Sequence, residues 1–159
     1  MFKALFSRFL SRFDSMEVDD PVLGHLRYDW QSRRWNGTTW FAPASAEVAV
    51  SVRSHGSEVE ATDRALFQSL GERYVALRPQ IAQVLHSLYQ SHVARPDAGM
   101  PAPQTAADMD RLTKLNRISV QDADTIELGY GFVDGAGRDD AMLTIRLKGW
   151  KAEGIALDA

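Results

Sequence analysis

Apolar side chains at the start of the chain follow a helical period. They recur at spacings of three and four residues, and Lys3, Arg8 and Arg12 fall on the opposite side. The apolar positions are Phe2, Leu5, Phe6, Phe9, Leu10 and Phe13. This pattern predicts an amphipathic helix over residues 1–14. Because an isolated helix of this length is marginal in water, its apolar side must be covered by its own domain, a partner protein or an anionic membrane surface.

Strand-like segments follow a linker predicted over residues 15–21. Segments 22–30 and 34–41 are rich in aromatic and β-branched residues, and they predict a β-hairpin closed by the polar residues 31–33. The pair Asn36-Gly37 is also a strong two-residue turn signal, so a hairpin that closes there is the alternative. The first interpretation is preferred because it leaves both strands with a usual length.

Residues 61–95 return to a helical period, with large apolar side chains every three or four positions. Those expected to be buried against the sheet are Leu70, Tyr74, Leu77, Ile81 and Leu88. Pro79 lies in the middle of this stretch, where it removes one backbone donor and clashes with the preceding turn. An unbroken helix of about 33 residues would be about 50 Å long, so we expect a kinked pair of helices on one face of the sheet.

Further strands are predicted on both sides of the helical region. Valines alternate with polar or small residues over 47–53, which is typical of a half-buried antiparallel strand. A short helix is predicted at 106–115, and strands at 117–121, 125–133, 141–148 and 151–157. The chain is therefore expected to be α+β, with an antiparallel sheet of about six strands, a kinked helical pair on one face and the N-terminal amphipathic helix. Residues 20–159 are expected to form a single α+β domain, preceded by the helix of residues 1–14.

Three features in the first half of the chain occur in the same order in a group of small bacterial domains. They are Val22-Leu-Gly-His-Leu-Arg-Tyr28, Trp35-Asn-Gly37 and the alternating strand at 47–53. Over about residues 20–157 the chain resembles these domains of unknown function, some of which are thought to be toxin-immunity proteins. The resemblance implies an α+β fold and an immunity-type protein that occludes a partner. It carries no catalytic signature, and residues 1–14 lie outside it.

The composition excludes several classes of protein. The 159 residues are 45% hydrophobic and 25% charged and include no cysteine, which excludes disulfide frameworks and thiolate metal sites. No segment approaches the roughly 20 apolar residues of a membrane span and no signal peptide is recognised, so we expect a cytoplasmic protein, or a peripheral membrane protein held by residues 1–14. The net charge is −3, and no basic patch with interleaved aromatic residues occurs beyond the N-terminus, so nucleic acid is not an expected partner.

Residue patterns typical of catalytic, metal or cofactor sites are missing from the sequence. The four histidines are His25, His55, His86 and His92. None of them has the spacing of paired metal ligands. Glycine-rich phosphate loops and nucleophile motifs are also missing. The sequence therefore predicts no metal, no cofactor and no catalytic residue, and it argues against an enzyme.

Aromatic residues give the best candidates for a partner-binding surface. Trp30, Trp35 and Trp40 gather on the first predicted hairpin, where they either form one wall of the core or expose their rings to a partner. The candidate partner-binding residues are Trp30, Trp35, Trp40, Phe2, Phe6, Phe9 and Phe13. The favoured function is a non-enzymatic interaction module of the immunity type that occludes another protein. The alternatives are a small hydrolase or transferase with a site built from distant residues, and a peripheral membrane adaptor that uses residues 1–14.

Overall fold

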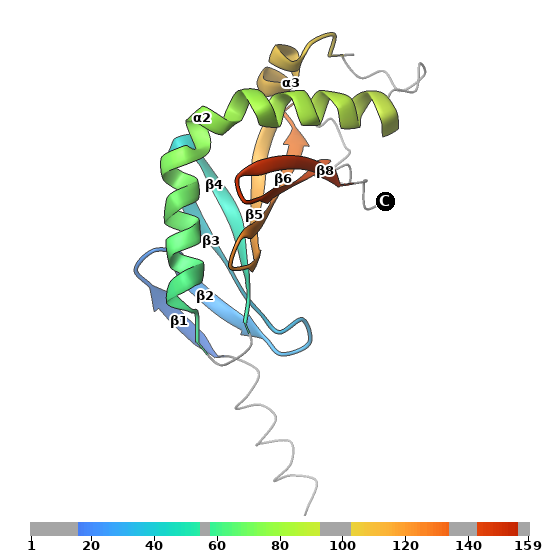
Figure 1. Ribbon diagram of the computed structural model, residues 1–159. Coiled ribbons are helices and arrows are strands. Elements are labelled where there is room, and N and C mark those ends of the chain that lie inside the picture. The colour runs from blue at the N-terminus through green and yellow to red at the C-terminus, as the bar shows by residue number, and fades with distance from the viewer. Residues whose placement is uncertain (1–15, 55–57, 93–102, 134–142, 156–159) are drawn as a thin grey trace, which may run out of the picture.

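The strands of the protein form one sheet, in which they follow one another in chain order (Figure 1). The structure is a computed structural model, and it describes residues 16–54, 58–92, 103–133 and 143–155. The strands are β1 (Glu17–Asp20), β2 (Gly24–Asp29), β3 (Arg34–Phe41), β4 (Ala46–Arg53), β5 (Thr113–Asp122), β6 (Thr125–Phe132), β7 (Leu143–Lys148) and β8 (Lys151–Ile155). The helices are the 3₁₀ turn η1 (Ala42–Ala44), the long helix α2 (Ala61–His92) and the short helix α3 (Ala106–Leu112).

Two antiparallel halves, β1–β4 and β5–β8, meet at a parallel pair in the middle of the sheet. β4 runs parallel to β5, with Ala49 opposite Arg117 and Ser51 opposite Ser119. A parallel pair needs a long crossover connection, and α2 and α3 supply it between β4 and β5. The expected α+β class is confirmed, and most of the neighbouring strands are antiparallel. The sheet is nevertheless mixed and has eight strands, so the prediction of a smaller, wholly antiparallel sheet is wrong.

β1 is a strand that the sequence prediction missed, because residues 15–21 have the composition of a linker. It lies at the edge of the sheet and is short and acidic, which is a common way for a sheet edge to avoid pairing with other chains. The buried carboxylate of Asp20 accepts hydrogen bonds from the amides of Val22 (2.9 Å) and Leu23 (3.0 Å). It also accepts one from Arg64 Nε (2.6 Å), so it joins the edge strand to the first turn of α2.

α2 is one continuous helix, and the pair of helices expected from Pro79 is therefore wrong. Figure 1 shows a sharp bend between a first half beside the N-terminal strands and a second half that runs past α3 and β8. Pro79 is exposed, as is Val75 one turn earlier, whose carbonyl loses its usual donor. Because this part of the helix faces solvent, water can bind that carbonyl, and the helix bends at the proline without ending there.

The core lies between α2 and one face of the sheet. Along β4 the buried side chains of Val48, Val50 and Val52 alternate with residues of higher exposure, which is the period of a sheet with one covered face. The buried members of the expected helix stripe are Leu70, Tyr74 and Ile81. Leu77 and Leu88 are only partly buried against the core, so the expectation of full burial holds for part of the stripe.

Replacing Pro79 with alanine is expected to leave the fold intact and to raise the free energy of unfolding by about 1 kcal/mol. The change restores one backbone donor to the carbonyl of Val75, and a net hydrogen bond is worth about that much. The far-ultraviolet circular dichroism and a urea denaturation curve would measure both effects. A loss of more than about 1 kcal/mol would contradict the prediction and would mean that the packing of α2 depends on the proline bend.

Candidate functional site

The face of the sheet opposite α2 carries polar side chains, and a group of them gathers on its central strands. Arg34 and Trp40 lie on this face of β3, Arg53 lies on β4 and Arg117 on β5. Their placement follows from strand alternation, because Trp35, Phe41 and the valines of β4 occupy the covered face. We call these four residues the arginine face.

Arg34 is the fixed centre of the arginine face. Its Nε donates to Ser51 Oγ (2.6 Å), and its Nη1 donates to Gln121 Oε1 (3.0 Å). Its Nη2 donates to Ser119 Oγ (2.6 Å) and to the carbonyl of Val120 (3.2 Å). These bonds connect β3 to β4 and β5, and all four acceptors are neutral, so the guanidinium is positioned without a carboxylate in direct contact.

Arg53 and Arg117 stand beside this network without partners of their own. Among the described residues neither side chain makes a hydrogen bond or an ion pair, and Arg117 Nε is buried with no acceptor. Arg117 lies opposite Ala49 on one neighbouring strand and Gly129 on the other, so small residues flank it. An arginine in this state is unusual, since buried polar groups normally have a hydrogen-bond partner.

The positive charges of the arginine face act on one another. Burial lowers the pKa of Arg34, the carboxylate of Glu127 opposes this, and the charges of Arg53 and Arg117 lower the pKa further. Glu127 itself accepts from Arg146 (3.0 Å) and from Gln121 Nε2 (2.8 Å), so its negative charge is shared with another cation. The arginine face therefore has an excess of positive charge on a chain whose net charge is −3.

The three tryptophans of the predicted partner-binding set lie in different places. Trp40 is 65% exposed on the arginine face, while the adjacent Phe41 is buried on the other side of β3. Trp30 is 43% exposed in the β2–β3 turn, where its ring packs edge-on against Tyr28 with the ring centres 4.7 Å apart. Trp35 is 2% exposed and belongs to the core, and its Nε1 has no acceptor within the described part of the chain. The structure thus brings only Trp40 to the central open face.

The remaining predicted partner-binding residues, Phe2, Phe6, Phe9 and Phe13, lie outside the described residues. The amphipathic helix of residues 1–14 and its three possible covers therefore stay predictions. Within the described ranges no helix is long and apolar enough to cross a membrane.

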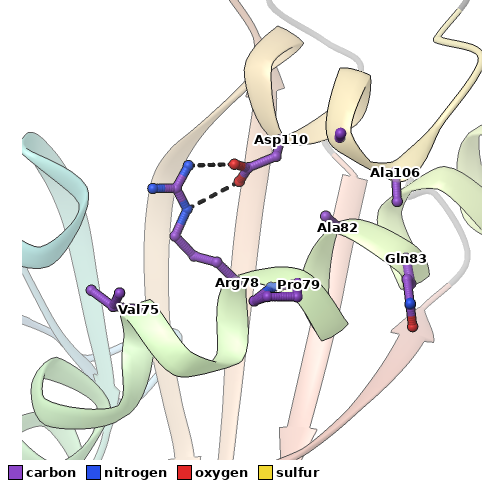
Figure 2. A pocket seen from close by; sticks show the side chains of 8 residues that line it. Val75, Arg78, Pro79, Ala82, Gln83, Ala106 and Asp110 are labelled. Carbon is purple, nitrogen blue, oxygen red and sulfur yellow. Dashed lines mark hydrogen bonds and ion pairs between the residues drawn. The ribbon is translucent and has the colours of Figure 1, made fainter.

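A groove of about 410 Å³ lies on the other side of the molecule, between α2 and α3. Its walls include the apolar side chains of Val75, Pro79 and Ala82. Figure 2 shows Arg78 extending toward Asp110 beside this groove, and the two groups form a paired contact at 3.0 and 2.5 Å. Because these charges neutralise each other, the groove presents no free charged group to a ligand.

A charged hollow of about 360 Å³ adjoins the arginine face between β4 and β8. Its acidic groups are Asp122, Glu127 and Glu153, and its basic groups are Arg53, Arg146 and Lys148. The hydrogen bond from Thr125 lowers the pKa of Asp122, against the effect of burial, so this carboxyl is ionised at neutral pH. A carboxylate in that state accepts hydrogen bonds but is not poised to donate a proton.

No set of three or more possible metal ligands gathers within the described parts of the chain. Comparisons with protein-family models, with curated proteins and with solved structures found no match. The candidate site, the arginine face, is therefore characterised from the contacts and charges of its own residues.

Sequence reasoning missed the arginine face because its members are far apart along the chain. Arg34 and Gln121 are separated by 87 positions, and they meet only because β4 and β5 are neighbours. Strand alternation did contain part of the signal. Within 47–53 the valines define the covered face, so Arg53 must lie on the opposite one.

Proposed function

We propose that this protein is a non-enzymatic interaction module that binds and occludes another protein through the arginine face. The observation that carries the proposal is an open sheet face that holds both the exposed ring of Trp40 and two arginines, Arg53 and Arg117, that have no partner among the described residues. Trp40 lies opposite Glu47 toward one end of β3 and Arg53 lies opposite Arg34 at the other end, so a partner that contacts both must span the length of the strand. An immunity-type role, in which a partner is blocked by surface contact, is the form of this function that the sequence resemblance supports.

The chemistry of these side chains suits protein recognition. Tryptophan and arginine are the residue types that most often dominate binding energy at protein interfaces. The ring of Trp40 can bury a large apolar area, and the guanidinium groups can make paired hydrogen bonds to a partner. Arg34 connects β3 to β4 and β5 through hydrogen bonds to Ser51 and Ser119, so the arginine face is preorganised for binding.

Replacing Trp40 with alanine is expected to weaken partner binding about 30-fold, which corresponds to the 2 kcal/mol or so of an interface hot spot. Full-length protein and the variant would be used to capture proteins from an extract of the source cells. A protein retained by the wild type and lost with Trp40→Ala would then be purified, and its dissociation constant measured by calorimetry. Trp40 is exposed, so the thermal unfolding of the variant should be nearly unchanged.

The matched control is Val75→Ser, which removes a side chain of equal 65% exposure from the bend of α2. This variant should capture the same protein with unchanged affinity. Capture that depends on Val75 and not on Trp40 would contradict the proposal and would move the interface to the groove between α2 and α3.

A small hydrolase or transferase is the second candidate, and the charged hollow beside β4–β8 is the observation that favours it. Both carboxylate oxygens of Glu127 are already engaged, by Arg146 and Gln121, which supports a structural role for that residue. The pKa of Asp122 is lowered by hydrogen bonding to Thr125, against the effect of burial, so this carboxyl is ionised at neutral pH. These features favour a binding surface over an acid–base site.

A further inference from the structure

We infer that Arg34, Arg53 and Arg117 form an oxyanion site that takes a carboxylate of an acidic protein partner. The inference deepens the proposed function and rests on it for the source of the carboxylate. It assigns to the arginine face a specific ligand chemistry, carried by an acidic segment of the partner.

Arg34 uses nearly all of its hydrogen-bond donors within the sheet. Its Nε and both hydrogens of Nη2 are used by neutral acceptors on β4 and β5. Nη1 makes one bond, to Gln121, which leaves its second N–H without an acceptor among the residues that the structure describes. Arg34 is thus a rigid cation with one donor to spare, positioned by the fold.

Arg53 and Arg117 are the other two cations of the arginine face. Arg53 and Arg117 have no hydrogen-bond or ion-pair partner among the described residues, although both sit close enough to Arg34 for their charges to act on it. Like charges held together repel, and a bound anion relieves that repulsion. Ala49 and Gly129 flank Arg117 with little side-chain bulk, so an acceptor can approach from the open face.

The charges around the arginine face favour a carboxylate over a phosphate as its ligand. Glu127 acts on Arg34, lines the same hollow as Arg53 and is shared with Arg146, so the local excess of positive charge suits a singly charged anion better than a doubly charged phosphate. Guanidinium groups bind carboxylates through paired, planar hydrogen bonds. Along the open face the basic cluster is interrupted by Glu47 beside Trp40 and by Glu17 and Asp19 on β1, so it does not form the continuous track that a nucleic-acid backbone needs.

The probe is a short Glu-Gly repeat peptide, with a Gln-Gly peptide of equal length as the neutral control. Both would be titrated into isotope-labelled full-length protein at low salt, and backbone amide and arginine Nε–H resonances followed by NMR. The Glu-Gly peptide should shift signals of β3, β4 and β5, and the Gln-Gly peptide should not. Binding should weaken as salt is added, because the contact is between surface charges.

The test variant is Arg53→Gln/Arg117→Gln, and its matched control is Arg111→Gln/Lys151→Gln, which removes the same charge from α3 and β8. The test variant should bind the Glu-Gly peptide at least about tenfold more weakly, and the control variant should bind within about twofold of the wild type. If the double variant fails to fold, the single variants Arg53→Gln and Arg117→Gln replace it, each with a smaller loss expected.

Three results would overturn the inference. One is equal binding of the Glu-Gly peptide by test and control variants. Another is absence of binding by the wild type. The third is preference for inorganic phosphate or an oligonucleotide over the peptide, with the same arginine dependence.

Two outcomes separate the oxyanion site from the proposed function. If a captured partner needs Trp40 but not Arg53 and Arg117, the oxyanion site is wrong and the proposed function stands. If peptide binding depends on the arginines but no captured partner needs Trp40, the oxyanion site stands and the proposed function is wrong.

Discussion

Replacing Asp20 with alanine is expected to lower the free energy of unfolding by about 3 kcal/mol, at the low end of the cost of breaking a buried ion pair because the side chain of Arg64 is 33% exposed. The carboxylate is fully buried, and it accepts from Val22 N, Leu23 N and Arg64 Nε. Its removal leaves two backbone amides and one guanidinium without their acceptor, and it separates β1 from the start of α2. Urea denaturation of wild type and variant would measure the difference.

The neighbouring Asp19 provides the matched control in the same strand. Asp19 accepts from His25 at 2.7 Å, but its side chain is almost fully exposed, so Asp19→Ala should cost less than about 1 kcal/mol. Equal losses for the two alanine variants would mean that the length of β1, and not the Asp20 carboxylate, is what stabilises the edge of the sheet.

The effect of Asp20 should also depend on pH. Burial acts to raise the pKa of Asp20, but the hydrogen bonds from Arg64, Val22 and Leu23 and the charge of Arg64 outweigh it and hold the pKa below its ordinary value of 3.8. A carboxyl with a lowered folded-state pKa contributes its full stability above the ordinary value and loses it as the pH falls through the lowered one. The stability gap between wild type and Asp20→Ala should therefore shrink only in strong acid.

Local sequence patterns correctly predicted those strands whose own side chains alternate between a buried and an exposed face. The alternating valines of 47–53 predicted β4, which spans Ala46–Arg53. The aromatic and β-branched segments 22–30 and 34–41 predicted the hairpin of β2 and β3, and the preferred turn at 31–33 was correct. In each case the period of buried and exposed positions is short enough to be visible within one segment.

What the sequence could not predict depends on distant parts of the chain. β1 is stabilised by pairing with β2 and by the contact of Asp20 with Arg64, 44 positions away, and not by apolar side chains of its own. The parallel pairing of β4 with β5 follows from the path of α2 and α3 across the sheet. Pro79 predicted a break, yet packing of both halves of α2 keeps the helix continuous, as tertiary contacts often override a local preference.

The candidate site shows the same limit. Trp40 could be recognised as a candidate, because its adjacency to Phe41 forces the two rings to opposite faces of a strand. Trp35 carries the same side chain but lies five positions away on the same strand, and it therefore points to the opposite face, into the core. The arginines could not be grouped before the order of the strands was known, because Arg34, Arg53 and Arg117 lie on three different strands.

Asn36-Gly37 is the pair for which local and long-range signals compete most clearly. As a two-residue turn signal it favours a hairpin end, yet Gly37 lies inside β3, opposite Leu26. A Cβ atom at Gly37 would stand 2.2 Å from the carbonyl oxygen of His25 and 2.9 Å from Leu26 Cδ2. The glycine is therefore required for the close approach of two backbones, which is the other common reason for glycine in a strand.

Gly37→Ala is accordingly expected to lower the free energy of unfolding by about 3 kcal/mol, at the upper end of the range for overpacking, because the backbone of β2 must move to accept the methyl group. Gly131→Ala in β6 is the matched control. Its new Cβ would stand 2.4 Å from Asn116 Nδ2, the end of an exposed and flexible side chain that can turn away, so the loss should stay below about 1 kcal/mol. Urea denaturation of the two variants under the same conditions measures the difference, and comparable losses would show that β2 can shift away from Gly37 at little cost.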